Sequence, residues 1–295
     1  MYVCERIVAF VVHQPLPTTC QNRPAISCPL PQTALQLHFQ TSSRRDKFVL
    51  HMSTAPPRRT VRLAWVGNSF VYYNNLPQML ACLLKYDGIN FKQKRVLVGG
   101  QSLHGHSQDP SVTNLLAQNQ WDYVVLQDNS AVPGGCDEHK LNASITALRD
   151  VFSPLLPRSG SGRVLLYSSW GHKIGSPVLE TYAEHYPSFE VMNEKTAAGY
   201  CMYKTVLKQA FLDVAIVPVG RAFSCVYQSD VEQGRDPDAP LSLFSRLFAP
   251  DSFHPSPLGT FLSACVFHHI ITGDFLFFIL FYFSRLFSLF STLST

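Results

Sequence analysis

Residues 61–70, VRLAWVGNSF, decide the fold: an apolar run ends at a glycine and is followed by Asn68 and Ser69. A short apolar run bounded by glycine predicts a buried β-strand. In an open α/β sheet, ligands bind just beyond the carboxyl ends of the strands. Ser69 therefore stands where a nucleophile would stand, although serine is also a preferred helix cap. The choice between these roles depends on whether a base and oxyanion donors occur elsewhere in the chain.

Short apolar runs and longer helical stretches alternate through the body of the chain, residues 61–273. Most of the runs are continuously apolar, as strands covered on both faces are. Right-handed crossovers then give an α/β protein of three layers, α/β/α, with a central parallel sheet of about five strands. Strands are predicted at 61–67, 92–99, 121–127, 163–169 and 213–219, and helices at 75–86, 110–119, 139–155, 190–212 and 257–272.

Residues 1–60 differ in composition from this body. They hold seven of the twenty prolines, many hydroxyl side chains and only two acidic residues, which is typical of a segment that does not pack. The apolar stretch at 7–12 is short for a signal peptide, so secretion is the less favoured location. We expect a disordered or targeting leader. The protein could then be directed to an organelle, or be cytoplasmic with its start near Met52.

Residues 274–295 form an apolar and aromatic tail. A helix that spans a membrane needs about 20 apolar residues, and Arg285 interrupts the stretch at 275–290. Membrane contact through this stretch is therefore an option that the sequence disfavours, and the alternatives are an additional packing helix or translated non-coding sequence.

Charge and cysteine spacing exclude several classes of protein. The chain has 24 basic and 20 acidic side chains; seven basic and two acidic ones lie in residues 1–60, which leaves 17 and 18 in the rest. A near-neutral body argues against nucleic acid as a partner. Eight scattered cysteines contain no Cys-x-x-Cys pair, and the histidines at 104, 106, 268 and 269 have no convincingly spaced third ligand. No metal or other cofactor is expected.

Polar and glycine residues follow the second and third predicted strands, as Gly99-Gly100-Gln101-Ser102 and Gln127-Asp128-Asn129-Ser130. The carboxyl ends of parallel strands meet at one edge of a sheet, so these residues should lie near Ser69. Backbone N–H groups and an amide are the donors that an oxyanion hole needs.

A candidate base lies in PDSFHPSPLGTF, residues 250–261, which contains the only Asp-x-x-His of the chain. Ser256 can cap the following helix and Pro257 can occupy its first position. Asp251 and His254 are therefore predicted on a short turn, where the carboxylate can orient the imidazole towards the edge of the sheet.

These segments resemble the four blocks of the SGNH (GDSL-like) hydrolase superfamily, named for Ser, Gly, Asn and His in this order. VGNSF resembles the first block, with Asn68 where the family usually has aspartate. VGGQS resembles the glycine block, with Gly100 as the donor and Gly99 as a shifted alternative. DSFHPSPLG resembles the last block closely. The resemblance covers roughly residues 60–273 and implies the flavodoxin-like SGNH hydrolase fold.

The third block departs most from the family pattern. VVLQDNS resembles Gly-x-Asn-Asp, with Asn129 on the asparagine, but Gln127 and Ser130 differ. The GNS and VVLQ segments together make the chain similar to divergent SGNH-like proteins rather than to lipases of the GDSL type.

The hypothesis that follows is a serine esterase without a cofactor. Ser69 would attack the ester carbonyl, His254 would accept its proton and Asp251 would orient the imidazole. The backbone N–H groups of Ser69 and Gly100, with the Asn129 amide, would bind the oxyanion. The resemblance implies an acyl or acetyl ester as substrate, on a small molecule or a carbohydrate.

Four further residues are expected to line the substrate cleft. Asn68 and Gln127 adjoin the predicted site, and Trp170 and His172 belong to SSWGHKIG, which follows the fourth predicted strand. A packed loop is the other interpretation of that segment. Because the third block has drifted, a non-catalytic carbohydrate-binding or interaction module on the same fold remains the alternative function.

Overall fold

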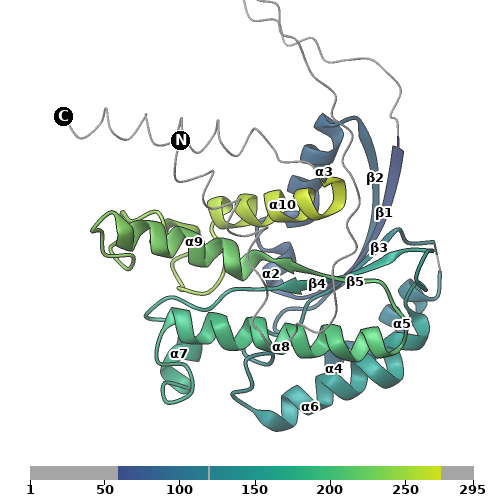
Figure 1. Cartoon of the computed structure of the whole chain (residues 1–295), viewed down its shortest axis with the longest axis horizontal. Helices are drawn as coiled ribbons and strands as arrows, with labels where there is room; N and C mark the ends of the chain where they lie inside the picture. The colour runs from purple at the N-terminus through teal and green to yellow at the C-terminus, as the bar shows by residue number, and fades with distance from the viewer. Residues whose placement is uncertain (1–58, 119, 274–295) are drawn as a thin grey trace, which may run out of the picture.

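Five parallel strands form the sheet at the centre of the protein, in the order β2-β1-β3-β4-β5 (Figure 1). This computed structural model describes residues 59–118 and 120–273. The expectations for the leader before Arg59 and for the tail after residue 273 lie outside the described residues. The strands are β1 (Arg59–Gly67), β2 (Ile89–Leu97), β3 (Tyr123–Leu126), β4 (Arg163–Ser168) and β5 (Val214–Pro218).

Helices cover both faces of the sheet, so the predicted α/β architecture of three layers is confirmed (Figure 1). One face carries α3 (Leu76–Tyr86), α9 (Val219–Glu232) and α10 (Pro257–Thr272); the other carries α4 (Leu103–Ser107), α5 (Pro110–Leu116), α6 (Glu138–Ala147) and α8 (Phe189–Gln209). The short helices α2 (Ser69–Tyr72) and α7 (Pro177–Thr181) complete the set. Among the helices described here, none has the length and apolar character needed to cross a bilayer.

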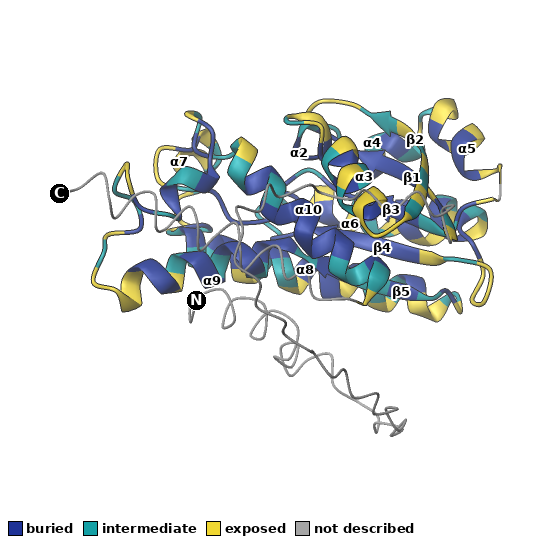
Figure 2. Ribbon diagram, turned by 90° about the horizontal axis from the view of Figure 1, so that it is seen from above, coloured by how far each residue is buried: buried dark blue, intermediate teal, exposed yellow. Residues whose placement is uncertain are grey.

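The central strands are buried on both faces because their apolar side chains alternate between two cores. On β1, Leu63 and Trp65 belong to the core beneath α10, whereas Ala64 and Val66 belong to the core beneath α8. Figure 2 shows the buried residues of the sheet between helices whose outer surfaces are exposed. Burial of such a leucine or valine side chain contributes roughly 1.5–3 kcal/mol.

Some helices differ from those that the sequence predicts. The helix predicted at 139–155 is regular only to Ala147, and then continues as a π-helical turn and a 3-10 turn to Leu155. Pro154 lacks the N–H that a regular helix would use there. Helix α9 was not predicted. It starts directly after β5, and its capping residue, Pro218, makes no side-chain cap bond.

The strand order makes the carboxyl ends of β1 and β3 the expected place for a binding site. The order 2-1-3-4-5 is that of flavodoxin-like sheets, in which the chain passes from β1 to one neighbour and returns on the other side. In such sheets ligands bind where the order reverses, between the first and third strands. Ser69 follows β1 and Asn129 follows β3, so both lie at this position.

Helix α8 is held close to the loop after β3 by Gly199. A Cβ atom at this position would lie 1.9 Å from the carbonyl oxygen of Pro133, which is backbone and cannot move aside easily. The absence of a side chain therefore sets how closely α8 can approach the loop that continues from Asn129.

We predict that Gly199→Ala lowers the free energy of unfolding by about 1–3 kcal/mol, because the added methyl group forces helix and loop apart. In an unobstructed helix the same change would raise stability by about 0.5–1 kcal/mol. Chemical denaturation measures the difference. Glu194→Ala, an exposed site on the same helix, is the control and should change little; a stabilised Gly199→Ala protein would contradict the prediction.

Candidate active site

The strand-to-helix turn at the end of β1 presents Ser69. Asn68 has an extended backbone and caps α2, because its Oδ1 accepts the N–H of Phe70 at 3.2 Å. Ser69 is the first residue of this four-residue helix and is partly exposed. The turn requires a glycine at position 67, since a Cβ there would lie 2.8 Å from Oε1 of Gln127.

Ser69, His254 and Asp251 form a continuous chain of hydrogen bonds. Nε2 of His254 lies 2.8 Å from Oγ of Ser69, and Nδ1 of His254 lies 2.7 Å from Oδ2 of Asp251. The structure therefore brings together the three residues that the sequence predicts as nucleophile, base and orienting acid. This is the geometry in which an imidazole can remove the proton of a hydroxyl.

The turn that carries the imidazole is built by Asp251. Its Oδ1 accepts the backbone N–H groups of Phe253 and His254 at 3.1 and 2.9 Å, while its Oδ2 binds the ring. Burial raises the pKa of the Asp251 carboxyl, but these hydrogen bonds outweigh it and the net shift is downward. The group therefore stays ionised. Ser256 then caps α10 through the N–H of Gly259, as predicted.

Asn68 ties the ends of three strands together. Its backbone N–H donates to Oε1 of Gln127 at 2.8 Å, and its Nδ2 donates to the carbonyl oxygens of Gln101 at 3.1 Å and Asp128 at 3.3 Å. An aspartate at this position could still cap α2 but could not donate to two carbonyl groups. The departure from Gly-Asp-Ser in the first block therefore has a structural reason.

The predicted oxyanion donors lie next to the residues that Asn68 binds. Nδ2 of Asn129 donates to the carbonyl oxygen of Gly100 at 2.8 Å, so these two residues are in contact. The N–H groups of Ser69 and Gly100 donate to no acceptor within the described part of the chain. Gly100 has φ +67°, a conformation that favours glycine, and it is exposed.

The buried carboxyl of Asp128 holds the loops that carry these donors. It is fully buried and accepts the N–H of Leu103 at 2.9 Å, the N–H of Asn129 at 2.7 Å and the hydroxyl of Tyr203 at 2.7 Å. Burial raises the pKa of Asp128, and the same hydrogen bonds partly oppose that shift. The carboxyl thus fixes the loop after β2 against the loop after β3 and against α8.

Comparison with known proteins bears on the fold. No protein-family model and no curated protein matches the chain. Among solved structures, a candidate SGNH hydrolase from Slackia heliotrinireducens is 21% identical with a TM-score of 0.51, covering 72% of this chain and 99% of that one. The fold is that of the SGNH hydrolases. A DUF4886 family protein from Bacteroides uniformis ATCC 8492 is 18% identical with a TM-score of 0.55, covering 73% of this chain and 84% of that one.

These likenesses confirm, at the level of the fold, the resemblance to SGNH hydrolases that the four blocks indicate. The matched share of the chain agrees with the described residues, which carry the whole sheet. At about one residue in five identical, the comparison concerns architecture; the roles of individual residues rest on the geometry given above.

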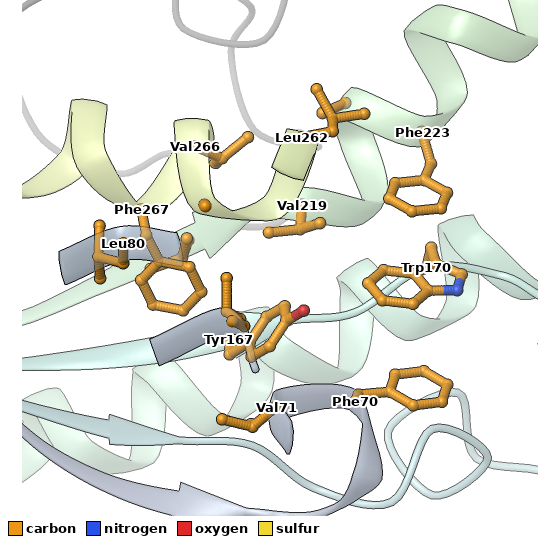
Figure 3. Packing of buried hydrophobic residues seen from close by; sticks show 14 of the residues in the cluster. Phe70, Val71, Leu80, Tyr167, Trp170, Val219, Phe223, Leu262, Val266 and Phe267 are labelled. Carbon is orange, nitrogen blue, oxygen red and sulfur yellow. The ribbon is translucent and has the colours of Figure 1, made fainter. Parts of the chain in front are cut away.

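The four residues expected in a substrate cleft lie inside the SGNH fold instead. Each is at most 3% exposed and is engaged within the protein. The backbone N–H of Asn68 donates to the side chain of Gln127, as described above. Trp170 donates its Nε1–H to the carbonyl oxygen of Phe253 at 3.1 Å. Its ring lies between Phe70 and Phe223, with centroids 4.7 and 4.3 Å away (Figure 3). These residues support the site from behind and do not line it.

His172 is likewise a buried support. Its Nδ1 lies 2.7 Å from Oγ of Ser176 and its Nε2 lies 3.0 Å from Oγ of Ser130, the residue after Asn129. Burial lowers the pKa of His172 to about 3, and repulsion by His254 acts in the same direction. The ring is therefore neutral, and it fixes the loop after β3 to the loop after β4.

Sequence reasoning missed Tyr73, which contacts the ring of His254, and Asn74, which bonds to the residue after His254. The ring of Tyr73 stacks on the ring of His254, with centroids 4.3 Å apart and an interplanar angle of 7°. Nδ2 of Asn74 donates to the carbonyl oxygen of Pro255 at 2.7 Å. Their only signal was their place in FVYYNN, directly after Ser69.

We predict that Asn68→Asp lowers the free energy of unfolding by about 2–4 kcal/mol at pH 7. The new carboxylate oxygen would face two carbonyl oxygens in a buried position, where an unpaired charged group is costly. Denaturant titration measures the loss. Asn142→Asp on α6, an exposed site, is the matched control; equal stability of the two variants would show that the bridge by Asn68 is unimportant.

We also predict that His172 makes stability depend on pH. The unfolded histidine binds a proton near pH 6.5, whereas the folded one does so only near pH 3. Between these values the unfolded state holds more protons, so acidification below pH 6.5 destabilises the native protein by up to about 1.4 kcal/mol per pH unit. His172→Gln should lack this component.

Unfolding measured between pH 7 and pH 4 checks this, with the exposed His139→Gln as control. The stability difference between native protein and His172→Gln should shrink, or reverse, as the pH falls. A constant difference over the whole range would refute the assignment of His172 as a buried neutral ring.

Proposed function

We propose that the protein is a serine esterase that hydrolyses acyl or acetyl esters of small molecules or carbohydrates. The observation that carries the proposal is the uninterrupted hydrogen-bond chain from Ser69 through His254 to Asp251. Its position at the carboxyl ends of β1 and β3 is where flavodoxin-like sheets bind ligands. The SGNH hydrolase fold agrees with this class of reaction. Carbohydrate as the alcohol rests on the family resemblance alone.

The proposed reaction begins when Oγ of Ser69 attacks the ester carbonyl carbon while Nε2 of His254 takes the hydroxyl proton. Asp251 accepts Nδ1–H, which leaves the lone pair on Nε2 free to act as the base. The carbonyl oxygen becomes an oxyanion near the N–H groups of Ser69 and Gly100 and the amide of Asn129. Each such donor contributes about 3–4 kcal/mol in enzymes of this type.

Collapse of this intermediate breaks the bond to the alcohol, which leaves with the proton from His254. Water then attacks the acyl group on Ser69, again giving a proton to His254. That proton returns to Oγ as the acid product departs. The cycle needs no group beyond this chain's own residues and water.

One observation favours the alternative of a non-catalytic binding or interaction module. The amide of Asn129 donates one hydrogen to the carbonyl of Gly100, and its Oδ1 accepts the N–H of Ala131 at 3.0 Å. Only its second amide hydrogen is left for an oxyanion. A carbohydrate could bind to the same polar groups through its hydroxyl groups without any reaction.

We predict that Ser69→Ala reduces kcat for nitrophenyl acetate by at least about a thousandfold, because the nucleophile is lost. The full-length native chain and the variant are compared by release of nitrophenol. Ser111→Ala, an exposed serine on α5, is the control and should keep full activity. Equal rates for native protein and Ser69→Ala would leave only the binding module.

A fluorophosphonate probe gives an independent measurement. The proposed mechanism expects a single phosphonyl adduct on Ser69, found by mass spectrometry of peptides, and no adduct in the His254→Gln variant. A labelled serine elsewhere, with Ser69 unmodified, would contradict the assignment of the nucleophile.

A further inference from the structure

We propose that Tyr73 is a positioning residue for the base: its ring stabilises the imidazolium ion that forms when His254 takes the proton of Ser69. The inference rests on the proposed esterase function and adds a residue that acts on the reaction through His254. As Oγ of Ser69 bonds to the carbonyl carbon, its proton moves to Nε2 of His254, and the ring acquires a positive charge that Tyr73 faces.

The stacking geometry suits this role. The two ring planes are 7° from parallel and their centroids are 4.3 Å apart, so the imidazole is stacked on the face of the phenol ring. The face of an aromatic ring carries partial negative charge and attracts a cation within about 6 Å of its centroid. Neutral imidazole gains little from this attraction and imidazolium gains more. An interaction that strengthens as the charge develops lowers the barrier to reaction.

Orientation, and not distance, distinguishes Tyr73 from the other neighbours of His254. Phe253, with its centroid 4.2 Å from that of the imidazole, and Phe70, at 5.7 Å, are also within the range of this attraction. Phe253 is tilted by 38° and Phe70 meets the imidazole at 66°, so neither presents its face in parallel. Asp251 binds Nδ1 in the plane of the ring, and Ser69 is at Nε2. Within residues 59–118 and 120–273, Tyr73 is the ring that lies parallel to this imidazole.

Hydrogen bonds of Tyr73 and of its neighbour Asn74 fix the position of Tyr73 relative to Ser69 and His254. Its N–H donates to the carbonyl oxygen of Ser69 at 2.8 Å. The next residue, Asn74, donates from Nδ2 to the carbonyl oxygen of Pro255 at 2.7 Å and to Oγ1 of Thr260 at 2.9 Å. Asn74 follows Tyr73 and Pro255 follows His254, so this hydrogen bond joins the residues next to the two stacked rings.

The ring of Tyr73, and not its hydroxyl, makes the contact. The side chain is 45% exposed, and the hydroxyl has no hydrogen-bond partner among the residues described. Removal of the hydroxyl should therefore preserve the interaction. Because the side chain is half in solvent, changes to it should also leave the fold intact.

The test is a series of rings of one shape and decreasing electron density at position 73: phenylalanine, 4-fluorophenylalanine, 3,4,5-trifluorophenylalanine and pentafluorophenylalanine. Each full-length variant is assayed with nitrophenyl acetate after its unfolding midpoint is shown to match that of the native protein. We expect Tyr73→Phe to keep kcat within about twofold of the native protein. Down the series kcat should fall stepwise by about two- to fivefold in all, with KM unchanged.

Two further variants sharpen the result. Tyr73→Leu keeps an apolar side chain without a charged face and should be as slow as the pentafluorinated ring, whereas Tyr73→Trp should restore activity because indole binds cations best. Pentafluorophenylalanine at Phe211, an 85% exposed position, controls for incorporation of the unnatural residue and should leave kcat unchanged.

Failure of this inference and failure of the proposed function are distinguishable. If native protein is active and Ser69→Ala is not, but kcat is flat across the fluorinated series, then Tyr73 does not stabilise the imidazolium and the esterase stands. A series that raises KM at constant kcat would likewise overturn the inference, by making Tyr73 a substrate contact. If native protein is as inactive as Ser69→Ala, both proposals fall.

Discussion

The amide of Asn68 joins the carboxyl ends of β1, β2 and β3, and the geometry of the site depends on this junction. The side-chain amide bonds to Gln101, Asp128 and Phe70, and the backbone N–H of the same residue donates to Gln127. Within that set, Gln101 and Asp128 accept from the side-chain N–H groups. Gln101 and Asp128 are the chain neighbours of Gly100 and Asn129, so one buried side chain sets where the proposed nucleophile and the proposed oxyanion donors lie relative to each other. Hydrogen bonds of this kind contribute about 0.5–1.5 kcal/mol each, but leaving a buried partner unsatisfied costs more. The glutamine that departs from the family pattern at 127 belongs to the same junction.

The parallel sheet could be predicted because strands buried on both faces need continuous apolar runs, as in β1 and β4. Where the prediction was wrong, the structure depends on contacts that local sequence does not contain. The chain turns from β5 into α9 without a capping side chain, so no start signal marks that helix. The edge strand β2 begins at Ile89, three residues before the predicted run, because pairing with β1 defines it more than its own composition does.

The proposed reacting groups could be predicted because each lies on a turn held by its own short-range hydrogen bonds. Asp251 binds the N–H groups of its own turn, and Asn68 caps its own helix; such short-range bonds leave a recognisable spacing in the sequence. The residues that support the site from other elements leave no such spacing in the sequence. His172 looked like a cleft residue, but its partner Ser130 is 42 positions away, and burial decides its protonation. Tyr73 belongs to the nucleophile segment, and only the fold shows that its ring covers the base.

The serine and the histidine that meet here are 185 positions apart in the chain. The imidazole arrives on the turn that leads into α10, the last helix of the described body, which packs against α3 and α9. During synthesis the serine hydroxyl would thus emerge early and stay without its base until the final helix docks. In the proposed mechanism, nucleophilic reactivity would therefore require completion of the domain, and a local detachment of α10 would abolish it while most of the sheet was still intact.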